Sequence, residues 1–396
     1  MAIIGIIAEY NPFHSGHSYH IRQARRQLGE GSPVVCVMSG NWVQRGDAAL
    51  CDKWSRTAMA IRGGADLVLE LPTLWAVSSA ETFARGGVFL LHATGVVDTL
   101  SFGSETGCLP PLQTVADYLD SEAYLPALRR HLDKGISFPV ARHRAVHEGC
   151  GQAAECLQNP NNNLGVEYLR AIRYTNSGIT PSTLLRQGVA HDSPASSADF
   201  ASASHLRQRL LSGDTSPLTP YLTLEDETVL REGGLSSLTY GTRGVFARLR
   251  AMSPEEFLLL PDSGEGLHNR LWEAVQQTSN LEDLYTLTKS RRYPHARIRR
   301  LVLWAFLGIH AEDRHDHPPY LRVLGMNRRG QALLKTMKAT ATLPILTKPA
   351  HVRELDREAQ WTLELEARCT SLYDLCRANF NLTHGRQEFR ENPVIL

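Results

Sequence analysis

Two histidines near the start of the chain have the type and spacing to act on phosphate groups. His14 and His17 flank Gly16 in the run His14-Ser15-Gly16-His17, which follows an apolar run over residues 2–8. A helix that begins there offers free N–H groups and a partial positive charge, and Gly16 allows close backbone approach. Imidazoles can also stabilise the charge that develops as pyrophosphate leaves. A helix cap with incidental histidines is the simpler alternative, but the place after a first strand favours a phosphate site.

Polar segments also follow the second and fourth apolar runs, at residues 39–46 and 103–107. Arg45 is a candidate ligand for a triphosphate or a carboxylate, because a guanidinium binds such groups in a bidentate manner. Lys53 is a second candidate, although Asp52 and Lys53 together are also typical of a surface helix start, with Asp52 as the cap. No GxxxxGK[ST] motif occurs in the chain, which excludes a P-loop.

A later pair of segments could close over the same ligand. Arg186 follows a short apolar run, and Ser202-Ala203-Ser204 begins a helix pattern that contains Arg207. Hydroxyls in such a position are usually only helix caps. Their combination with the two early histidines favours a second phosphate-binding segment.

The elements that must position these residues alternate between strand and helix patterns. Buried strands are predicted at 2–8, 34–38, 66–71, 96–102 and 182–185, and helices at 53–62, 78–92 and 166–174. Repeated strand–helix units indicate an α/β protein with a doubly wound parallel sheet. Ligands of such sheets bind beyond the carboxyl ends of the strands, where the polar segments are expected.

The chain is long enough for two domains. Residues 109–159 interrupt the alternation as a less regular stretch, and a segment rich in Ser, Thr, Gly and Pro lies at 212–220. We therefore predict an α/β nucleotide-binding domain over 1–215 and a mainly α-helical domain over 216–396, since the later patterns are mostly helical.

Composition limits the class of protein. Of the 396 residues, 42% are hydrophobic and 21% charged, and the net charge is +1. We predict a soluble cytoplasmic protein without a signal peptide or membrane span. The seven cysteines include no CxxC pair, which favours reduced thiols. His143, His147, Cys150 and Cys156 do not match the spacing of a standard zinc site, so we predict no metal site.

The strongest basic cluster lies at residues 289–300, ahead of an apolar helix pattern. Arginines on a helix beside an aromatic residue suit RNA phosphates and bases. A solvated helix face with acidic neighbours is the alternative. In a protein of nearly zero net charge, the clustering favours RNA, with five candidate contacts: Arg291, Arg292, Arg297, Arg299 and Arg300.

Several motifs together resemble the tRNA(Met) cytidine acetate ligase family. They are the run from Gly5 to His20, Met38-Ser39-Gly40-Asn41-Trp42-Val43-Gln44-Arg45-Gly46, Asp66-Leu67-Val68-Leu69-Glu70-Leu71-Pro72, Phe102-Gly103-Ser104-Glu105, Pro160-Asn161-Asn162, the run from Leu164 to Leu169, Ala201-Ser202-Ala203-Ser204 and the run from Tyr320 to Gly325. The resemblance spans nearly the whole chain. Ser15, Ser204 and Trp42 depart mildly from the family, which often has Asn, Thr and Phe there.

The resemblance implies an HxGH nucleotidyltransferase domain with a helical C-terminal domain. It implies formation of acetyl-adenylate from acetate and ATP, and transfer of the acetyl group to N4 of the wobble cytidine of elongator tRNA(Met). Mg²⁺ would accompany the ATP, and no obligate protein partner is implied. His14 and His17 would be catalytic. The ATP-binding positions carried over are Ile7, Ala8, Glu9, Tyr10, Asn11, Pro12, Phe13, His14, Ser15, Gly16, His17, Ser18, Tyr19, His20, Gly103, Asn162 (with Asn161 and Asn163 adjacent) and Arg186.

Two other functions fit parts of the pattern. A nucleotidyltransferase that adenylylates a small phosphorylated metabolite would use the same histidines, but it would not need the helical second half or the basic cluster. A non-catalytic RNA-binding module that kept an ancestral fold is the other alternative. The intact histidine motif and Arg186 argue against that module.

Overall fold

The apolar runs of the first half become neighbouring strands of one sheet. The computed structural model describes residues 1–186, 201–380 and 385–396. Five parallel strands lie in the order β5-β2-β1-β6-β7. Ile6 of β1 lies opposite Cys36 of β2, and Val35 lies opposite Leu67 of β5. The strands are β1 (Ile4–Ala8), β2 (Val34–Ser39), β5 (Leu67–Leu71), β6 (Thr99–Ser104) and β7 (Thr180–Leu185).

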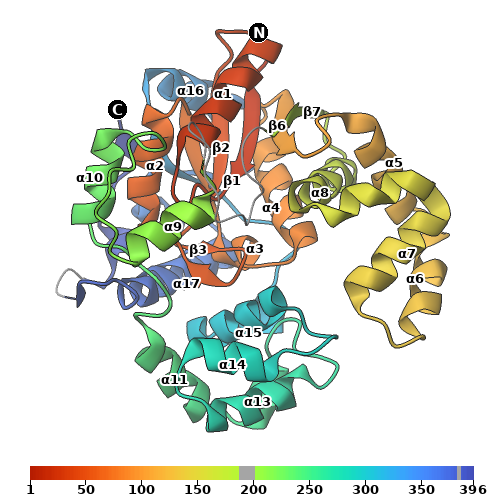
Figure 1. Ribbon diagram of the computed structural model, residues 1–396. Coiled ribbons are helices and arrows are strands. Elements are labelled where there is room, and N and C mark those ends of the chain that lie inside the picture. Colours follow the sequence, from red (N-terminus) through yellow and green to blue (C-terminus); the bar gives the residue numbers. More distant parts are fainter. Residues whose placement is uncertain (187–200, 381–384) are drawn as a thin grey trace.

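Strand β1 is apolar throughout because it is buried on both faces of the sheet. Ile4 and Ile6 belong to one hydrophobic core, which includes Ile21 of α1 (Ser15–Leu28). Ile7 belongs to a second core with Leu91 of α4 (Ala80–Ala93). Figure 1 shows helices on both sides of the strands. The predicted α/β architecture with a doubly wound sheet is therefore confirmed.

The order of the strands creates a switch point beside β1. From β1 the chain builds outward to β2 and β5, and it then returns to place β6 and β7 on the other side of β1. The connections after β1 and β6 therefore diverge and leave a crevice at the carboxyl ends of these strands.

Between β6 and β7 the chain forms helices, so the expected irregular stretch at 109–159 is wrong. The elements are α5 (Leu109–Leu119), α6 (Tyr124–Leu132), α7 (Phe138–Cys150), the 3-10 helix η1 (Gly151–Gln158) and α8 (Pro160–Tyr174). Prolines obscured the pattern, yet α5, α7 and α8 each carry proline in the first turn, where the ring breaks no hydrogen bond.

A separate helical layer follows in the second half and lies below the sheet in Figure 1. The chain reaches it through α9 (Ala203–Leu211) and α10 (Leu224–Glu232). The layer comprises α11 (Thr242–Ala251), α12 (Pro254–Leu258), α13 (Leu267–Gln277), α14 (Leu281–Thr288) and α15 (His295–Leu307). No helix in the described ranges is long and apolar enough to cross a membrane.

After α15 the chain returns to the sheet, which the sequence patterns did not indicate. Strand β8 (Leu321–Met326) pairs antiparallel with β5, and β9 (Ile345–Leu346) and β10 (Val394–Ile395) pair with β8. The sheet is therefore mixed at this edge. The division at residue 216 stays a prediction, but the second part contributes three strands rather than helices alone.

The remaining elements are short or cover the edges. They are the hairpin of β3 (Trp42–Val43) and β4 (Asp47–Ala48), α2 (Lys53–Arg62), α3 (Thr73–Ala76), η2 (Ala311–Asp313), α16 (Arg328–Thr340), η3 (Pro349–Glu354), α17 (Arg357–Asp374) and η5 (Gln387–Phe389). Helix α2 has the predicted bounds, and Asp52 caps it by accepting a bond from the Ser55 amide at 2.8 Å. The cap prediction for Asp52 is thus confirmed.

Candidate active site

A cavity of about 390 Å³, here called the main cavity, lies at the carboxyl ends of β1, β6 and β7. Its walls come from the segment after β1, the β3–β4 hairpin, the end of β6, the start of α8, the end of β7 and the start of α9. The loops that the sequence predicted to converge do so here. The volume is in the range of small-molecule and cofactor sites, about 300–1,000 Å³.

The two histidines form one unit at the start of α1. Nδ1 of His14 accepts a hydrogen bond from the Gly16 amide at 3.0 Å, and Nδ1 of His17 accepts one from the His14 amide at 3.2 Å. The ring centroids lie 3.9 Å apart, and both residues line the main cavity. Because each Nδ1 accepts, the proton of each neutral ring is on Nε2, which is then a hydrogen-bond donor.

The expectation of free amides at this helix N-terminus is wrong for the first residues. The Ser15 amide donates to the Tyr221 carbonyl at 2.8 Å, and the Gly16 amide is bonded to His14. The amide of His17 donates to the His14 carbonyl at 2.8 Å. The helix therefore contributes its partial positive charge and the imidazoles, rather than unbonded N–H groups.

Arginines from separate elements add positive charge to the same cavity. Arg45, Arg186 and Arg207 all line it. Arg207 of α9 donates to the Asn11 carbonyl at 2.8 Å and to Ser204 Oγ at 2.9 Å, which fixes its guanidinium beside the segment after β1. Burial lowers the pKa of Arg186, while Glu105 opposes that shift. A guanidinium remains protonated at neutral pH even so.

Gly103 is needed because the Arg186 side chain packs against it. A Cβ at position 103 would lie 3.0 Å from Cγ of Arg186. The amide of Arg186 donates to the Ser104 carbonyl at 3.0 Å, which continues the pairing of β6 and β7 to the rim of the cavity. Gly103 and Arg186, predicted as separate ATP contacts, are thus neighbours.

His20 is a third imidazole on the cavity wall, and its environment keeps it neutral. Its Nε2 lies 3.0 Å from Ser101 Oγ. Burial, followed by the positive charge of Arg186, lowers the pKa of His20 to about 4. A neutral ring at this position adds no positive charge, so the arginines and the end of α1 provide it.

Most of the predicted ATP-binding positions line the main cavity, but some lie behind it. Those on the wall are Ile7, Ala8, Glu9, Tyr10, Asn11, His14, Gly16, His17, Tyr19, His20, Gly103 and Arg186, whereas Pro12, Phe13, Ser15, Ser18 and Asn162 are not on it. Phe13 packs in the core beside Tyr10, with ring centroids 4.9 Å apart.

Of the adjacent asparagines at the start of α8, Asn161 lies on the cavity wall and Asn162 is fully buried. Oδ1 of Asn162 accepts bonds from the amides of Glu105 at 2.9 Å and Thr106 at 3.1 Å. Asn162 therefore holds the loop after β6, whereas Asn161 lies at the cavity wall and its side-chain amide donates to Glu105 Oε1 at 2.6 Å.

The basic cluster at 289–300 does not form one surface. Arg291 and Arg292 are exposed, whereas Arg300 is partly buried. Arg297 lies 3.0 Å from a Glu265 carboxylate oxygen, as the solvated-face alternative expected.

Arg299 and Asp47 both line the main cavity, and the sequence patterns did not predict this position for either residue. Gly46 has a φ of 73°, and a Cβ at this position would lie 2.5 Å from the Arg299 backbone. This close packing of two distant segments cannot be inferred from the residues around Gly46.

Lys53 is not a ligand candidate, because it lies in a buried ion cluster formed with Glu70, Glu388, Arg322 and Glu366. Nζ of Lys53 lies 2.6 Å from Glu70 Oε1 and 2.5 Å from Glu388 Oε2. Although burial lowers it, the pKa of Lys53 stays above its usual value because of Glu388 and Glu70. Both the phosphate and the surface interpretations of Lys53 are therefore wrong, since its side chain is 0% exposed.

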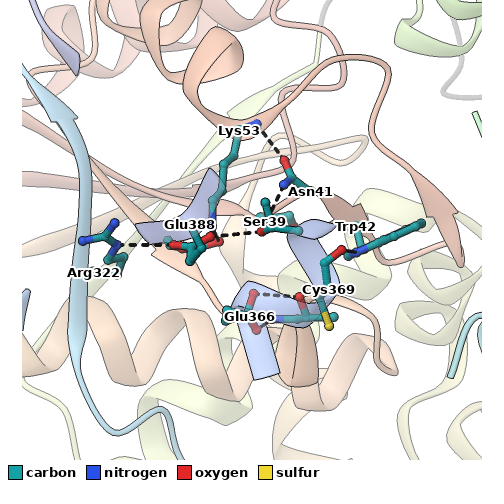
Figure 2. Close-up of polar contacts among 12 residues, drawn as sticks. Ser39, Asn41, Trp42, Lys53, Arg322, Glu366, Cys369 and Glu388 are labelled. Atoms are coloured by element: carbon teal, nitrogen blue, oxygen red, sulfur yellow. Dashed lines mark hydrogen bonds and ion pairs between the residues drawn. The ribbon is translucent and has the colours of Figure 1, made fainter. Parts of the chain in front are cut away.

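The buried ion cluster joins α2 and β5 to the C-terminal return, which comprises β8, α17 and η5 (Figure 2). Arg322 of β8 lies 3.6 Å from Glu388, and Glu366 of α17 accepts bonds from the Thr73 amide at 2.6 Å and hydroxyl at 2.8 Å. Trp42 of β3 donates to the Cys369 carbonyl at 3.0 Å. The hairpin is therefore held from beneath by residues of α17.

No metal site emerges in the described part of the chain. No group of three or more His, Cys, Asp or Glu residues is placed there to hold an ion. His143 lies 3.7 Å from Glu155, and Cys150 and Cys156 are free thiols.

The fold and the imidazole–arginine cavity define the nucleotidyltransferase class of α/β proteins. The family described as HIGH Nucleotidyl Transferase matches residues 1–388.

Relatives place the chain more narrowly. It is 38% identical over 394 residues to the tRNA(Met) cytidine acetate ligase of Thermoanaerobacter sp. (strain X514), covering 96% of this chain and 97% of the relative. It is 37% identical over 417 residues to that of Syntrophomonas wolfei, covering 100% of this chain and 99% of the relative. The chain therefore belongs to the tRNA(Met) cytidine acetate ligase family.

Solved structures agree with this assignment over the full length. The apo crystal structure of Thermotoga maritima TmcAL superposes with a TM-score of 0.92 at 31% identity, covering 100% of both chains. A second crystal form of that protein, bound with alpha-thio ATP, matches equally well.

Proposed function

We propose that this chain is an ATP-dependent ligase that activates acetate as acetyl-adenylate. It then transfers the acetyl group to N4 of the wobble cytidine of elongator tRNA(Met). Family membership supports the overall reaction, and the alpha-thio ATP bound by the Thermotoga maritima relative supports ATP as a ligand. The proposal includes the adenylate intermediate, the identity of the carboxylate and the acceptor atom.

One observation carries the proposal: the coupled His14–His17 pair on the wall of the main cavity, at the start of α1. Both Nε2 atoms are donors when the rings are neutral, and the end of the helix dipole adds positive charge behind them. Phosphoryl transfer needs positioning and charge stabilisation more than covalent side-chain chemistry. The pair meets that need because its geometry is fixed by backbone bonds before a ligand binds.

In the first half-reaction, an acetate oxygen attacks the α-phosphorus of ATP and the bond to pyrophosphate breaks. His14 and His17 would bind the phosphate oxygens on which charge accumulates. Arg186, which directly follows β7, and Arg207 of α9 would hold the triphosphate. Mg²⁺ would bind through the ATP oxygens and water, since the described residues offer no protein cluster for it.

In the second half-reaction, the cytidine amine attacks the acetyl carbonyl and the bond to AMP breaks. The base must leave its stack for its amine to reach the activated acetyl group, which costs little for a nucleotide in a loop. Of the five candidate arginines, Arg291 and Arg292 are exposed and would contact tRNA phosphates. Arg297 pairs with Glu265, and Arg299 lines the main cavity.

Mass spectrometry of tRNA incubated with the protein, ATP and isotopically labelled acetate tests the proposal. The expected result is labelled acetylcytidine at the wobble position of elongator tRNA(Met), dependent on both ATP and acetate. A mutant tRNA with uridine at that position is the matched control and should stay unlabelled. Unmodified tRNA, together with no acetate-dependent exchange of pyrophosphate into ATP, would overturn the proposed function.

A further inference from the structure

A smaller cavity of about 150 Å³ adjoins the main cavity at the junction of the hairpin and the helical layer. The two cavities share Asp47 of β4 and Arg299 of α15. The small cavity is otherwise lined by Leu238, Thr239, Thr242, Asn280, Leu281, Glu282 and Tyr285, and the Glu282 carboxylate lies 3.7 Å from Nη2 of Arg299. Its volume is below the range of about 300–1,000 Å³ for drug-sized ligands, so it suits a fragment the size of one base.

The two shared residues present opposite hydrogen-bonding character. Oδ1 of Asp47 accepts from the amides of Ala48 at 2.8 Å and Leu238 at 3.2 Å. Oδ2 of Asp47 lies 4.0 Å from Nη1 of Arg299. Asp47 is therefore an acceptor with one oxygen held by the backbone, and Arg299 offers only donors.

The position of this pair is set by close packing rather than by flexible side chains alone. Gly46 lies directly against the Arg299 backbone, where no Cβ fits. The Arg299 guanidinium lies 5.0 Å from the centroid of the Tyr285 ring, and this ring is only 4% exposed. A buried aromatic face thus supports the guanidinium from behind.

We propose that the small cavity is the acceptor subsite and takes one unstacked cytosine, with its N4 amine at Asp47 and its O2–N3 edge at Arg299. This assignment rests on the proposed function. Carboxylates accept from N4 of cytosine in known base recognition. Uracil has an oxygen where cytosine has the amine, so the Asp47 carboxylate would repel it.

The shared wall gives the amine access to the activated carboxylate. The amine nitrogen forms a bond to the acyl carbon, and the bond from that carbon to the AMP oxygen breaks with its electron pair leaving on AMP. One amine proton passes to the Asp47 carboxylate.

The test compares acetyl transfer to tRNA with acetate-dependent pyrophosphate exchange in Asp47→Asn. Asparagine keeps the Oδ1 acceptor for Ala48 and Leu238, so the hairpin should remain folded. We expect the ratio of transfer to exchange to fall about 10²-fold or more, the range of general-base contributions. The preference for tRNA with cytidine over uridine at the wobble position should also fall toward equality in a binding assay.

Asp283→Asn is the matched control, since it removes the same charge from α14 outside both cavities. Its ratio of transfer to exchange should stay within twofold of the unaltered protein. Parallel loss of transfer and exchange in Asp47→Asn, or unchanged transfer, would overturn the acceptor subsite. Failure of the proposed function looks different, because the unaltered protein would then show no acetate-dependent exchange.

Discussion

The main cavity and the buried ion cluster use similar charged groups in opposite ways. In the cluster, Lys53 is enclosed by Glu70 and Glu388 at 2.6 and 2.5 Å, and the three side chains are 0–2% exposed. At the main cavity, arginines and imidazoles from different elements face a common space of about 390 Å³. The first arrangement pairs opposite charges within the protein, and the second gathers cationic and imidazole groups around a cavity.

The different surroundings of these charged groups show that a charged residue beside a polar loop need not contact a ligand. Lys53 and Arg45 both follow β2, yet only Arg45 lines the cavity. Their separation depends on α17 and η5, which bring carboxylates to Lys53 and none of them to Arg45. Helix α17 links the two regions, since it carries Glu366 of the cluster and also binds Trp42 of the hairpin through the Cys369 carbonyl.

Replacement of the imidazoles should give the largest effect on activity. We expect His14→Asn combined with His17→Ala to lower acetate-dependent pyrophosphate exchange by about 10³-fold or more, because removal of one such donor costs about 10²–10³. Asparagine is a good helix cap, so the melting temperature should change little. His14→Ala is the contrasting variant and should also lose about 1 kcal/mol of stability from the missing cap. Exchange at the unaltered rate would remove the pair from the mechanism.

The largest effect on stability should come from the buried ion cluster. Lys53→Met leaves the carboxylates of Glu70 and Glu388 buried without their ammonium partner, and removal of one partner of a buried pair typically costs about 3–5 kcal/mol. Urea denaturation should show this loss, and adding Glu388→Gln should recover part of it. A Lys53→Met protein as stable as the unaltered one would contradict the structural role of the cluster.

Glu366 should make the stability of the protein fall as pH rises. Burial, and then the charge of Glu70, raises the pKa of Glu366 from 4.5 to about 8. The folded protein therefore holds a proton that the unfolded chain releases, so this contribution is complete below about pH 4.5 and is lost as pH rises to about 8. The slope is at most about 1.4 kcal/mol per pH unit. Denaturation curves of Glu366→Gln should lack this slope, and an identical slope in both proteins would refute it.

His20 should give a smaller slope of opposite sign, because its ring is buried in the neutral form. Its pKa is lowered from 6.5 to about 4. The unfolded chain then binds a proton that the folded protein does not, so stability is complete above about pH 6.5 and is lost as pH falls through about 4. His20→Gln, which can still bond to Ser101, should flatten the profile between these values. A profile unchanged by this substitution would show that His20 is already charged in the folded protein.

Local patterns predicted the five parallel strands and the segment that begins the site. The apolar run before Glu9, the cap at Asp52 and the imidazole pair of His14 and His17 each lie within a short segment, where strand burial and helix initiation follow from neighbouring residues. The same reasoning failed for the helices at 109–159, since prolines in first turns look like breaks. It also failed to separate Asn161 from Asn162, because the two differ only in which side of α8 they occupy.

The amino-acid sequence by itself determined the α/β order, the loop that carries the imidazoles and the family to which the chain belongs. Tertiary structure alone decided that Lys53 meets a carboxylate 335 residues away, that Arg299 joins the cavity and that β8 completes the sheet. These two groups of features differ in the separation of the interacting residues along the sequence, because helical hydrogen bonds and periodic burial depend on residues within one segment. The partner of a buried charge, by contrast, is fixed only when distant segments pack together.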